Sequence, residues 1–126
     1  DAQGIRRVPI HAIVHITGGG IPEKFGPLLD ARGLSANLNN LYPPCKEMLL
    51  CAEWLHMPDG ECYRVWGCGQ GALVVVPKEA VERFLNLARQ HQVEARAAGQ
   101  IEKNRYTSQV SIYSRFSEAQ IAFPAQ

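Results

Sequence analysis

The sequence has almost no net charge and no apolar run of transmembrane length. Its 13 Lys and Arg residues nearly balance its 12 Asp and Glu residues, which leaves a formal net charge of +1 at pH 7. A balanced charge does not favour nucleic acid or an anionic membrane as a partner. A signal-peptide pattern is also missing. We therefore expect a cytoplasmic protein that binds neither nucleic acid nor membrane.

Closely spaced cysteine pairs, as found in zinc knuckles and thioredoxin-like sites, are missing too. The four cysteines are Cys45, Cys51, Cys62 and Cys68, and no two of them form a C-x-x-C pair. A chain of 126 residues with 46% hydrophobic content can build a core without disulfides. The pattern predicts reduced, mostly buried thiols and no metal site. A metal site formed by His56 with two of these cysteines is the less favoured alternative.

The length suits one domain. The chain begins with Asp1 rather than Met, and it has no internal repeat and no low-complexity segment. We interpret residues 1–126 as a single domain of a longer protein, and we expect the rest of that protein to hold part of any active site.

The most informative stretch joins an apolar run to three glycines. Residues 10–16 are apolar and rich in β-branched side chains, which predicts a buried strand. Glycines fill positions 18–20, and Pro22 then favours the first turn of a helix. This order aims free backbone N–H groups and the positive end of a helix dipole at one point, and Thr17 adds a hydroxyl. The pattern therefore predicts an anion site.

Two titratable side chains flank these glycines. His15 stands at the end of the predicted strand, beside the loop, whereas we interpret His11 as a surface histidine. Glu23 falls in the first helical turn, where a carboxylate suits the helix dipole. The loop lacks the lysine of a P-loop and the full dinucleotide fingerprint, so a tight turn after an edge strand remains an alternative.

Hydrophobic spacing predicts an α+β or α/β layered domain in which helices pack on a mostly mixed sheet. Helices are predicted over residues 22–29, 45–55 and 78–92, and strands over residues 34–38, 72–76, 94–101, 108–113 and 120–123. The run at 72–76 is apolar on both faces, which is typical of a central strand. We expect it to form a core with the helix that contains Phe84.

Glycine and proline mark the predicted breaks. The helix predicted over 45–55 is broken at residues 57–60, and a turn is predicted at 104–107. Residues 61–66 fit either a short helix or an extended segment. A second glycine loop covers residues 67–71, and Gly99 is a possible bulge.

Taken together, the two glycine loops resemble those of a known family. His15-Ile16-Thr17-Gly18-Gly19-Gly20, with Glu23 three residues on, resembles the H-I-T-G-G-G-x-x-E segment of aminoimidazole ribonucleotide synthetase, or phosphoribosylformylglycinamidine cyclo-ligase. Residues 61–71, E-C-Y-R-V-W-G-C-G-Q-G, resemble its E-M-Y-R-T-F-N-M-G-I-G stretch. Shorter similarities at residues 42–44, 74–77 and 99–101 follow in the same order. The similar part is the family's C-terminal domain.

The resemblance implies a layered α/β/α-type domain with a mixed sheet and packed helices. It implies an ATP-dependent cyclo-ligase of purine biosynthesis that converts formylglycinamidine ribonucleotide to aminoimidazole ribonucleotide. ATP and Mg would be bound mainly by an N-terminal domain outside this sequence, and the full-length protein would be a homodimer. The isolated chain is then expected to fold but to be inactive.

The resemblance also implies roles for individual residues. His15 would orient or protonate a substrate oxygen, while no residue is expected to ligate metal. The residues that would bind phosphate or substrate are Thr17, Gly18, Gly19, Gly20, Glu23, Gly69 and Gly71.

Five positions depart from the family pattern. Gly67 and Lys24 replace asparagines, Cys68 replaces a methionine, and Lys46 and Glu47 fall near the apolar start of a helix in the family. These departures keep a second hypothesis open, namely a diverged, non-catalytic domain that binds a phosphate ligand or a partner chain.

Overall fold

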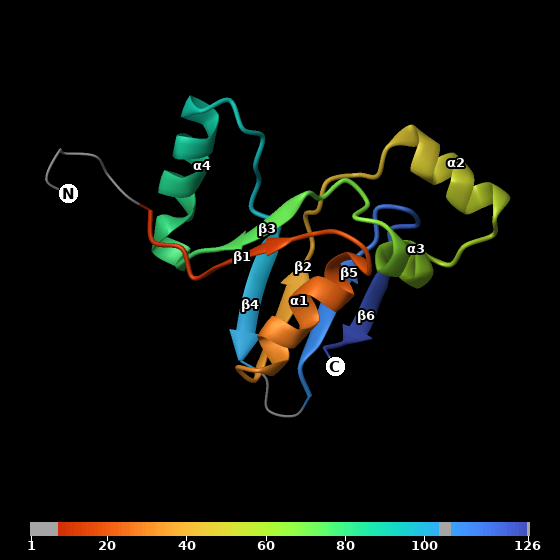
Figure 1. Ribbon diagram of the computed structural model, residues 1–126, viewed down its shortest axis with the longest axis horizontal. Helices are drawn as coiled ribbons and strands as arrows, with labels where there is room; N and C mark the ends of the chain where they lie inside the picture. Colours follow the sequence, from red (N-terminus) through yellow and green to blue (C-terminus); the bar gives the residue numbers. More distant parts are fainter. Residues whose placement is uncertain (1–7, 104–106, 126) are drawn as a thin grey trace, which may run out of the picture.

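The computed structural model describes residues 8–103 and 107–125 (Figure 1). Its strands form a two-stranded sheet, β1-β3, and a four-stranded sheet of order β4-β2-β5-β6. In chain order the elements are β1 (Ala12–His15), α1 (Gly20–Asp30), β2 (Leu34–Leu38), α2 (Lys46–Trp54), α3 (Asp59–Val65), β3 (Ala72–Val75), the 3₁₀ turn η1 (Lys78–Ala80), α4 (Val81–Gln90), β4 (Gly99–Lys103), β5 (Gln109–Tyr113) and β6 (Gln120–Pro124).

The four-stranded sheet is mixed, as predicted. Strand β2 pairs antiparallel with β4 and parallel with β5, and β5 forms an antiparallel hairpin with β6. Because helices pack against this mixed sheet, the predicted α+β fold class is confirmed.

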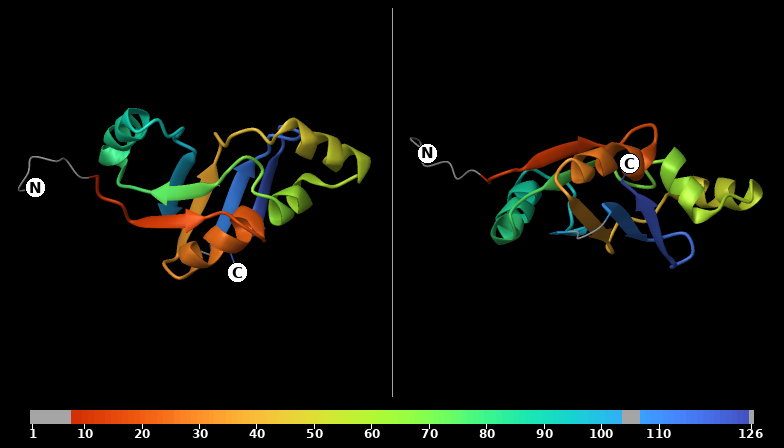
Figure 2. Two further views of the ribbon diagram at one scale, coloured as in Figure 1. Left: turned by 45° about the horizontal axis from the view of Figure 1, so that its top comes forward. Right: turned by 90° about the horizontal axis from the view of Figure 1, so that it is seen from below.

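The core lies on one face of this sheet. Alternation along β2 and β5 turns Ala36, Val110 and Ile112 to the same side, where they are buried. Helix α1 packs on that side with Phe25 and Leu29, and it contacts β2, β5 and β6. Figure 2 shows α1 and the β1-β3 sheet on the same side of the four-stranded sheet.

Strand β3 is not the central strand that its sequence indicates. Among the described strands it pairs only with β1, with Val74 opposite Ile13. Leu73 and Val14 face the core, whereas Ile13 is 66% exposed. A run of valines therefore reflects the general preference of β-branched residues for strands, which does not specify how many neighbours the strand has.

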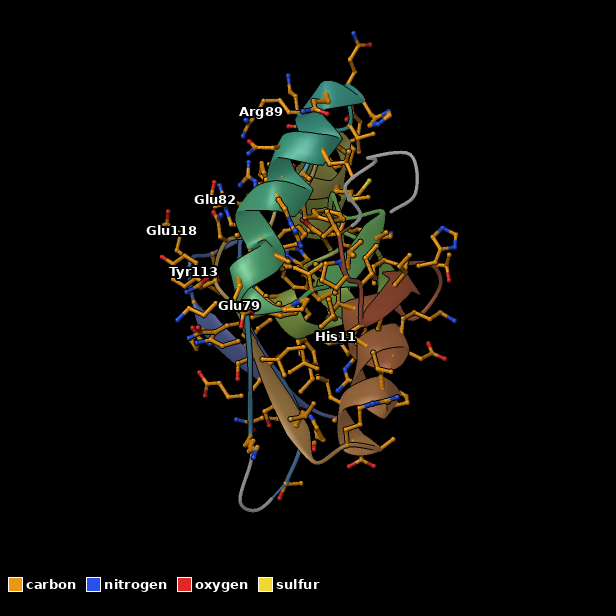
Figure 3. All side chains as sticks on the ribbon, turned by 90° about the vertical axis from the view of Figure 1, so that its left-hand side faces the viewer. His11, Glu79, Glu82, Arg89, Tyr113 and Glu118 are labelled. Atoms are coloured by element: carbon orange, nitrogen blue, oxygen red, sulfur yellow. The ribbon has the colours of Figure 1, made fainter. Side chains whose placement is uncertain are left out.

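Helix α4 forms close to its predicted position, but its expected place in the core is wrong. No residue of α4 is buried, and Phe84 is only half-buried. The chain turns at Pro77 and carries α4 beyond one end of the β1-β3 sheet (Figure 1). Figure 3 faces this helix and shows Glu82 and Arg89 along its flank. The core instead joins α1 and α3 to the sheets.

Several boundaries also differ from the prediction. Residues 61–66 are mostly helical, because α3 already begins within the predicted break at 57–60. The strand predicted over 94–101 is replaced by β4, and Gly99 pairs regularly with Leu38 rather than forming a bulge. A Cβ at Gly99 would overlap the carbonyl oxygen of Asn37, which explains the glycine. Of the turn predicted at 104–107, residues 104–106 lie outside the described residues.

Helices of the described residues are all too short or too polar to cross a membrane.

Candidate functional site

The first glycine loop connects β1 to α1, and two of its glycines have left-handed backbone angles. The φ angle is +93° at Gly19 and +66° at Gly20. Side chains rarely adopt such angles, so both positions favour glycine. Gly18 has no such requirement, and a Cβ added there would have no heavy atom within 4 Å.

Gly20 is needed for packing rather than for ligand access. A Cβ at this buried position would overlap the carbonyl oxygen of Tyr63 and lie 2.9 Å from that of Trp66. Tyr63 lies in the last turn of α3 and Trp66 directly follows this helix, so α1 and α3 approach each other closely here.

The N-terminus of α1 offers fewer free donors than the sequence indicates. The N–H of Gly20 donates to the carbonyl oxygen of Thr17 at 2.9 Å, and Pro22 has no N–H. Ile21 is fully buried. The accessible part of the loop is therefore the backbone around Gly18 and Gly19.

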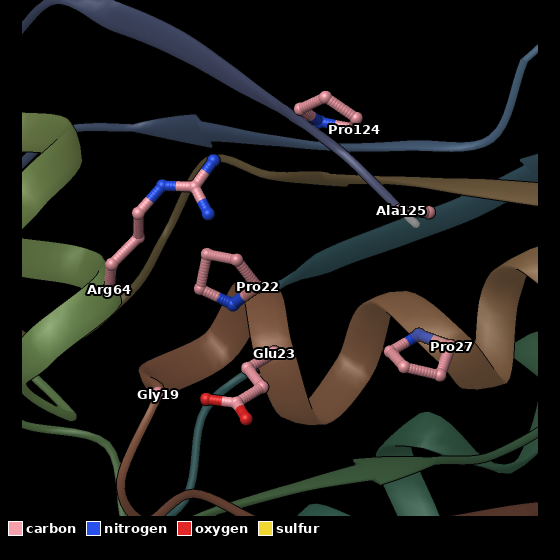
Figure 4. Close-up of a pocket in the computed structure, with 7 residues that line it drawn as sticks. All are labelled: Gly19, Pro22, Glu23, Pro27, Arg64, Pro124 and Ala125. Carbon is pink, nitrogen blue, oxygen red and sulfur yellow. The ribbon is translucent and has the colours of Figure 1, made fainter.

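Gly19 lines an open pocket of about 250 Å³ (Figure 4). Pro22 and Glu23 of α1 form one side, and Arg64 of α3 reaches across with its guanidinium carbon 4.9 Å from the Phe123 ring centroid. The Glu23 carboxylate turns back over Gly19, where a Cβ would overlap it. The pocket thus combines one cationic and one anionic side chain.

The structure brings together only part of the predicted site. Of the predicted residues, Gly19 and Glu23 line this pocket. His15 is exposed at the end of β1, opposite Ala72, and is not among the pocket residues. Arg64 is a pocket residue that was not predicted, although the Tyr-Arg pair of the second motif contains it.

The second glycine loop is fixed by contacts within the protein. The side-chain amide of buried Gln70 donates to the carbonyl oxygens of Cys68, at 2.8 Å, and Gly67, at 3.1 Å, and its oxygen accepts from the N–H of Tyr42. Gly69 has a φ of +99°, and a Cβ there would lie 2.5 Å from the carbonyl oxygen of Pro43. This close packing explains Gly69 structurally.

Gly71 is different, because it is exposed and a Cβ there would meet no atom within 4 Å. A phosphate-binding role for Gly69 and Gly71 stays a prediction.

The four cysteines are free, and two of them are fully buried. Cys68 donates from its Sγ to the carbonyl oxygen of Cys62 at 3.4 Å. Burial, with a smaller contribution from Cys62, raises the pKa of Cys68 to about 12. Burial also raises the pKa of Cys62. Cys45 is exposed and Cys51 half-buried, so the expectation of mostly buried thiols holds for only two of the four.

No group of three or more His, Cys, Asp or Glu side chains in the part of the chain that the structure describes is arranged to hold a metal ion. The alternative of a site formed by His56 with Cys51 and Cys62 therefore finds no support in this geometry.

Thiol reactivity should follow this division. In the native protein without reductant, we expect a thiol reagent to modify Cys45 first and Cys62 and Cys68 much more slowly, because the thiolate is the reactive form. After denaturation all four thiols should react. The chromophore released by the reagent, followed over time, measures the rate of modification in the native protein and the number of thiols after denaturation. Fewer than four thiols in a freshly purified, denatured sample would contradict the prediction of reduced cysteines.

Comparison of the sequence with known proteins assigns the chain to a family. The family model described as AIR synthase related protein, C-terminal domain, matches residues 2–111. A phosphoribosylformylglycinamidine cyclo-ligase of Parasynechococcus marenigrum is 32% identical over 96 residues, which cover 75% of this chain. A cyclo-ligase of the same name from Staphylococcus aureus is 32% identical over 107 residues, or 82% of the chain. The human trifunctional purine biosynthetic protein adenosine-3 is 32% identical over 109 residues, or 77% of the chain.

The chain spans a minor part of each of these relatives. The aligned residues make up 27% of the Parasynechococcus protein, 30% of the Staphylococcus protein and 10% of the human protein. The match of the family model over most of the sequence, together with this level of identity, shows that the chain belongs to the AIR synthase related family, as its C-terminal domain.

Proposed function

We propose that this chain is the C-terminal domain of an ATP-dependent cyclo-ligase of purine biosynthesis, which converts formylglycinamidine ribonucleotide to aminoimidazole ribonucleotide. The names of two relatives that each match at least three quarters of the chain support this proposal. Because the chain covers less than a third of those relatives, an N-terminal domain of the same protein would bind most of the ATP and Mg. The homodimer and the cytoplasmic location stay predictions.

Within this proposal, the pocket beside Gly19 binds a phosphate group of the substrate or of ATP. The observation that carries the assignment is the left-handed Gly19 at the start of α1, with the Arg64 guanidinium across the pocket. Backbone N–H groups and a guanidinium form charge-assisted hydrogen bonds with phosphate oxygens. Such contacts would also stabilise charge on a phosphoryl group during transfer.

Other predicted residues would act around this pocket. Thr17 and His15 are exposed on the segment that leads into the loop, and their hydroxyl and imidazole would orient a substrate oxygen. Glu23 is exposed, so its side chain can rotate away from Gly19 when a phosphate arrives. The described residues do not supply a cluster of His, Cys, Asp or Glu side chains that could hold Mg.

A second candidate function is a diverged domain without catalytic activity. The specific observation in its favour is the Glu23 carboxylate, which occupies the space over Gly19 where an anion would bind. Like charges at short distance repel, so this arrangement weakens phosphate binding unless Glu23 moves.

Replacing Gly19 with valine tests whether the first glycine loop binds phosphate. In the intact protein, Gly19→Val should lower the affinity for a ribonucleotide phosphate at least tenfold, because valine strains the backbone by about 1–2 kcal/mol and fills the approach to the loop. Calorimetric titration measures the affinity, and circular dichroism checks the fold.

Gly18→Val is the matched control, because Gly18 has no close neighbour and no positive φ. It should change the affinity much less. Glu23→Gln should raise the affinity several-fold by removing the competing charge. Unchanged affinity in a folded Gly19→Val variant would mean that the loop is a turn and not the phosphate site.

A further inference from the structure

Two arginines meet at the edge of the four-stranded sheet where its parallel strands end. Strands β2 and β5 run parallel, with Leu38 opposite Ile112, so the segments that follow them emerge at the same edge. Leu41 and Tyr42 follow β2, and Arg115 follows β5. This carboxyl edge of parallel strands is a common position for ligand sites in α/β sheets.

Both guanidinium groups donate to one neutral acceptor. The Nη1 of Arg115 lies 2.8 Å from the carbonyl oxygen of Leu41, and the Nη1 of Arg96 lies 3.4 Å from the same oxygen. The Arg96 guanidinium also stacks on Tyr42, with its carbon 4.1 Å from the ring centroid. Segments 74 and 55 residues away from Leu41 thus converge on a single carbonyl.

This pair of cations has no acidic partner among the described residues. Neither guanidinium lies within 4.0 Å of a carboxylate there. Asp59, which contacts the turn that holds Arg115, accepts hydrogen bonds from the hydroxyls of Ser114 and Ser117 instead. In the segment that follows β2, the buried hydroxyl of Tyr42 also has no hydrogen-bond partner in the described structure.

An oxyanion would complete this arrangement. Two positive charges that share a neutral acceptor repel each other, and an anion between them turns the repulsion into attraction. Each guanidinium has five N–H donors, of which the Leu41 carbonyl occupies one. Most of the donors therefore remain for a ligand.

We propose that Arg96 and Arg115 form a binding site for the phosphate group of a small molecule. A carboxylate has two oxygens, and one arginine saturates both in a bidentate pair. A phosphate monoester offers three oxygens and a charge of −1.5 to −2 near neutral pH, which suits two guanidiniums. The site shares no residue with the pocket lined by Gly19 and Arg64, so it does not depend on the function proposed above.

Arginine side-chain signals provide the test. Inorganic phosphate is titrated into the 126-residue chain while ¹H–¹⁵N spectra follow the Nε–Hε groups, and acetate is titrated in parallel. The signals of Arg96 and Arg115 should shift together with one dissociation constant, and acetate should bind at least tenfold more weakly. Arg89 is the internal control, since it lies on exposed α4 and bonds to Asn86.

Substitution of Arg96, the exposed arginine of the pair, tests whether both guanidinium groups bind the same phosphate. Arg96→Gln should raise the phosphate dissociation constant read from the Arg115 signal at least tenfold, whereas Arg89→Gln should leave it unchanged. Because Arg96 is exposed, its loss should not unfold the protein, as circular dichroism would confirm. The proposal is overturned if the Arg115 signal shifts no more than that of Arg89, or if Arg96→Gln leaves its dissociation constant unchanged.

Discussion

Gly20→Ala is expected to destabilise the fold more than any other alanine substitution in the first glycine loop. Alanine at a φ of +66° costs about 1–2 kcal/mol. The new Cβ also overlaps the carbonyl oxygen of Tyr63, so α1 and α3 must separate or the backbone must shift. Together these effects should lower the free energy of unfolding by roughly 3 kcal/mol or more. Urea unfolding followed by circular dichroism measures the change.

Two other glycines separate the contributions to this loss. Gly33 has nearly the same φ, +63°, but a Cβ there would meet no atom within 4 Å, so Gly33→Ala isolates the backbone cost. Gly18→Ala has neither cost and should stay within about 0.5 kcal/mol of the native protein. If Gly20→Ala costs no more than Gly33→Ala, the close packing of α1 on α3 does not contribute to stability.

The elements that the sequence predicts well are those with local signals. The bounds of β2 match the prediction at both ends, and α1 starts at the glycines beside Pro22. Alternation of Val110 and Ile112 with polar neighbours correctly indicates a strand with one buried face. Such patterns depend only on which residues stand next to each other, so they can be read without knowledge of the tertiary fold.

The sequence does not show which strand each strand pairs with or which elements each helix packs against. The valines of β3 suit a strand with two neighbours as well as one with a single neighbour, and only the β1-β3 pairing decides between them. The apolar side of α4 likewise predicts a helix, but it does not indicate which other elements of the fold this helix packs against. Both errors arise because burial is set by contacts between distant segments.

In the candidate sites too, some features follow from local sequence and others depend on tertiary packing. The left-handed angle at Gly19 and the first-turn position of Glu23 follow from the glycine run and Pro22. The place of Arg64 beside Gly19, and the meeting of Arg96 with Arg115, depend on how α3 and the ends of β2 and β5 pack. Family resemblance identifies the chain, but only the fold shows which basic residues are brought together.

A second large effect is expected at alkaline pH. Burial raises the pKa of Cys68 from 9.0 to about 12, and it also raises the pKa of fully buried Tyr63. The Cys68 thiol therefore stays neutral in the folded state, whereas in the unfolded chain it ionises near pH 9. Its contribution to the free energy of unfolding is fully present below pH 9 and is lost as the pH rises to 12, because ionisation favours the unfolded chain. For Cys68 the loss approaches about 4 kcal/mol, at 1.36 kcal/mol per pKa unit.

Cys68→Ser tests the assignment, because a serine hydroxyl can still donate to the carbonyl oxygen of Cys62 but does not ionise in this range. The free energy of unfolding, measured from pH 8 to pH 11.5, should fall steeply in the native protein and much less in this variant. Cys45→Ser should keep the native slope, since Cys45 is exposed. The slopes are compared rather than the absolute values, because serine also changes packing at neutral pH. Equal slopes in the native protein and in Cys68→Ser would show that the Cys68 thiol is not the titrating group. The next group to test would then be Tyr63, whose hydroxyl accepts a hydrogen bond from the backbone N–H of Arg115.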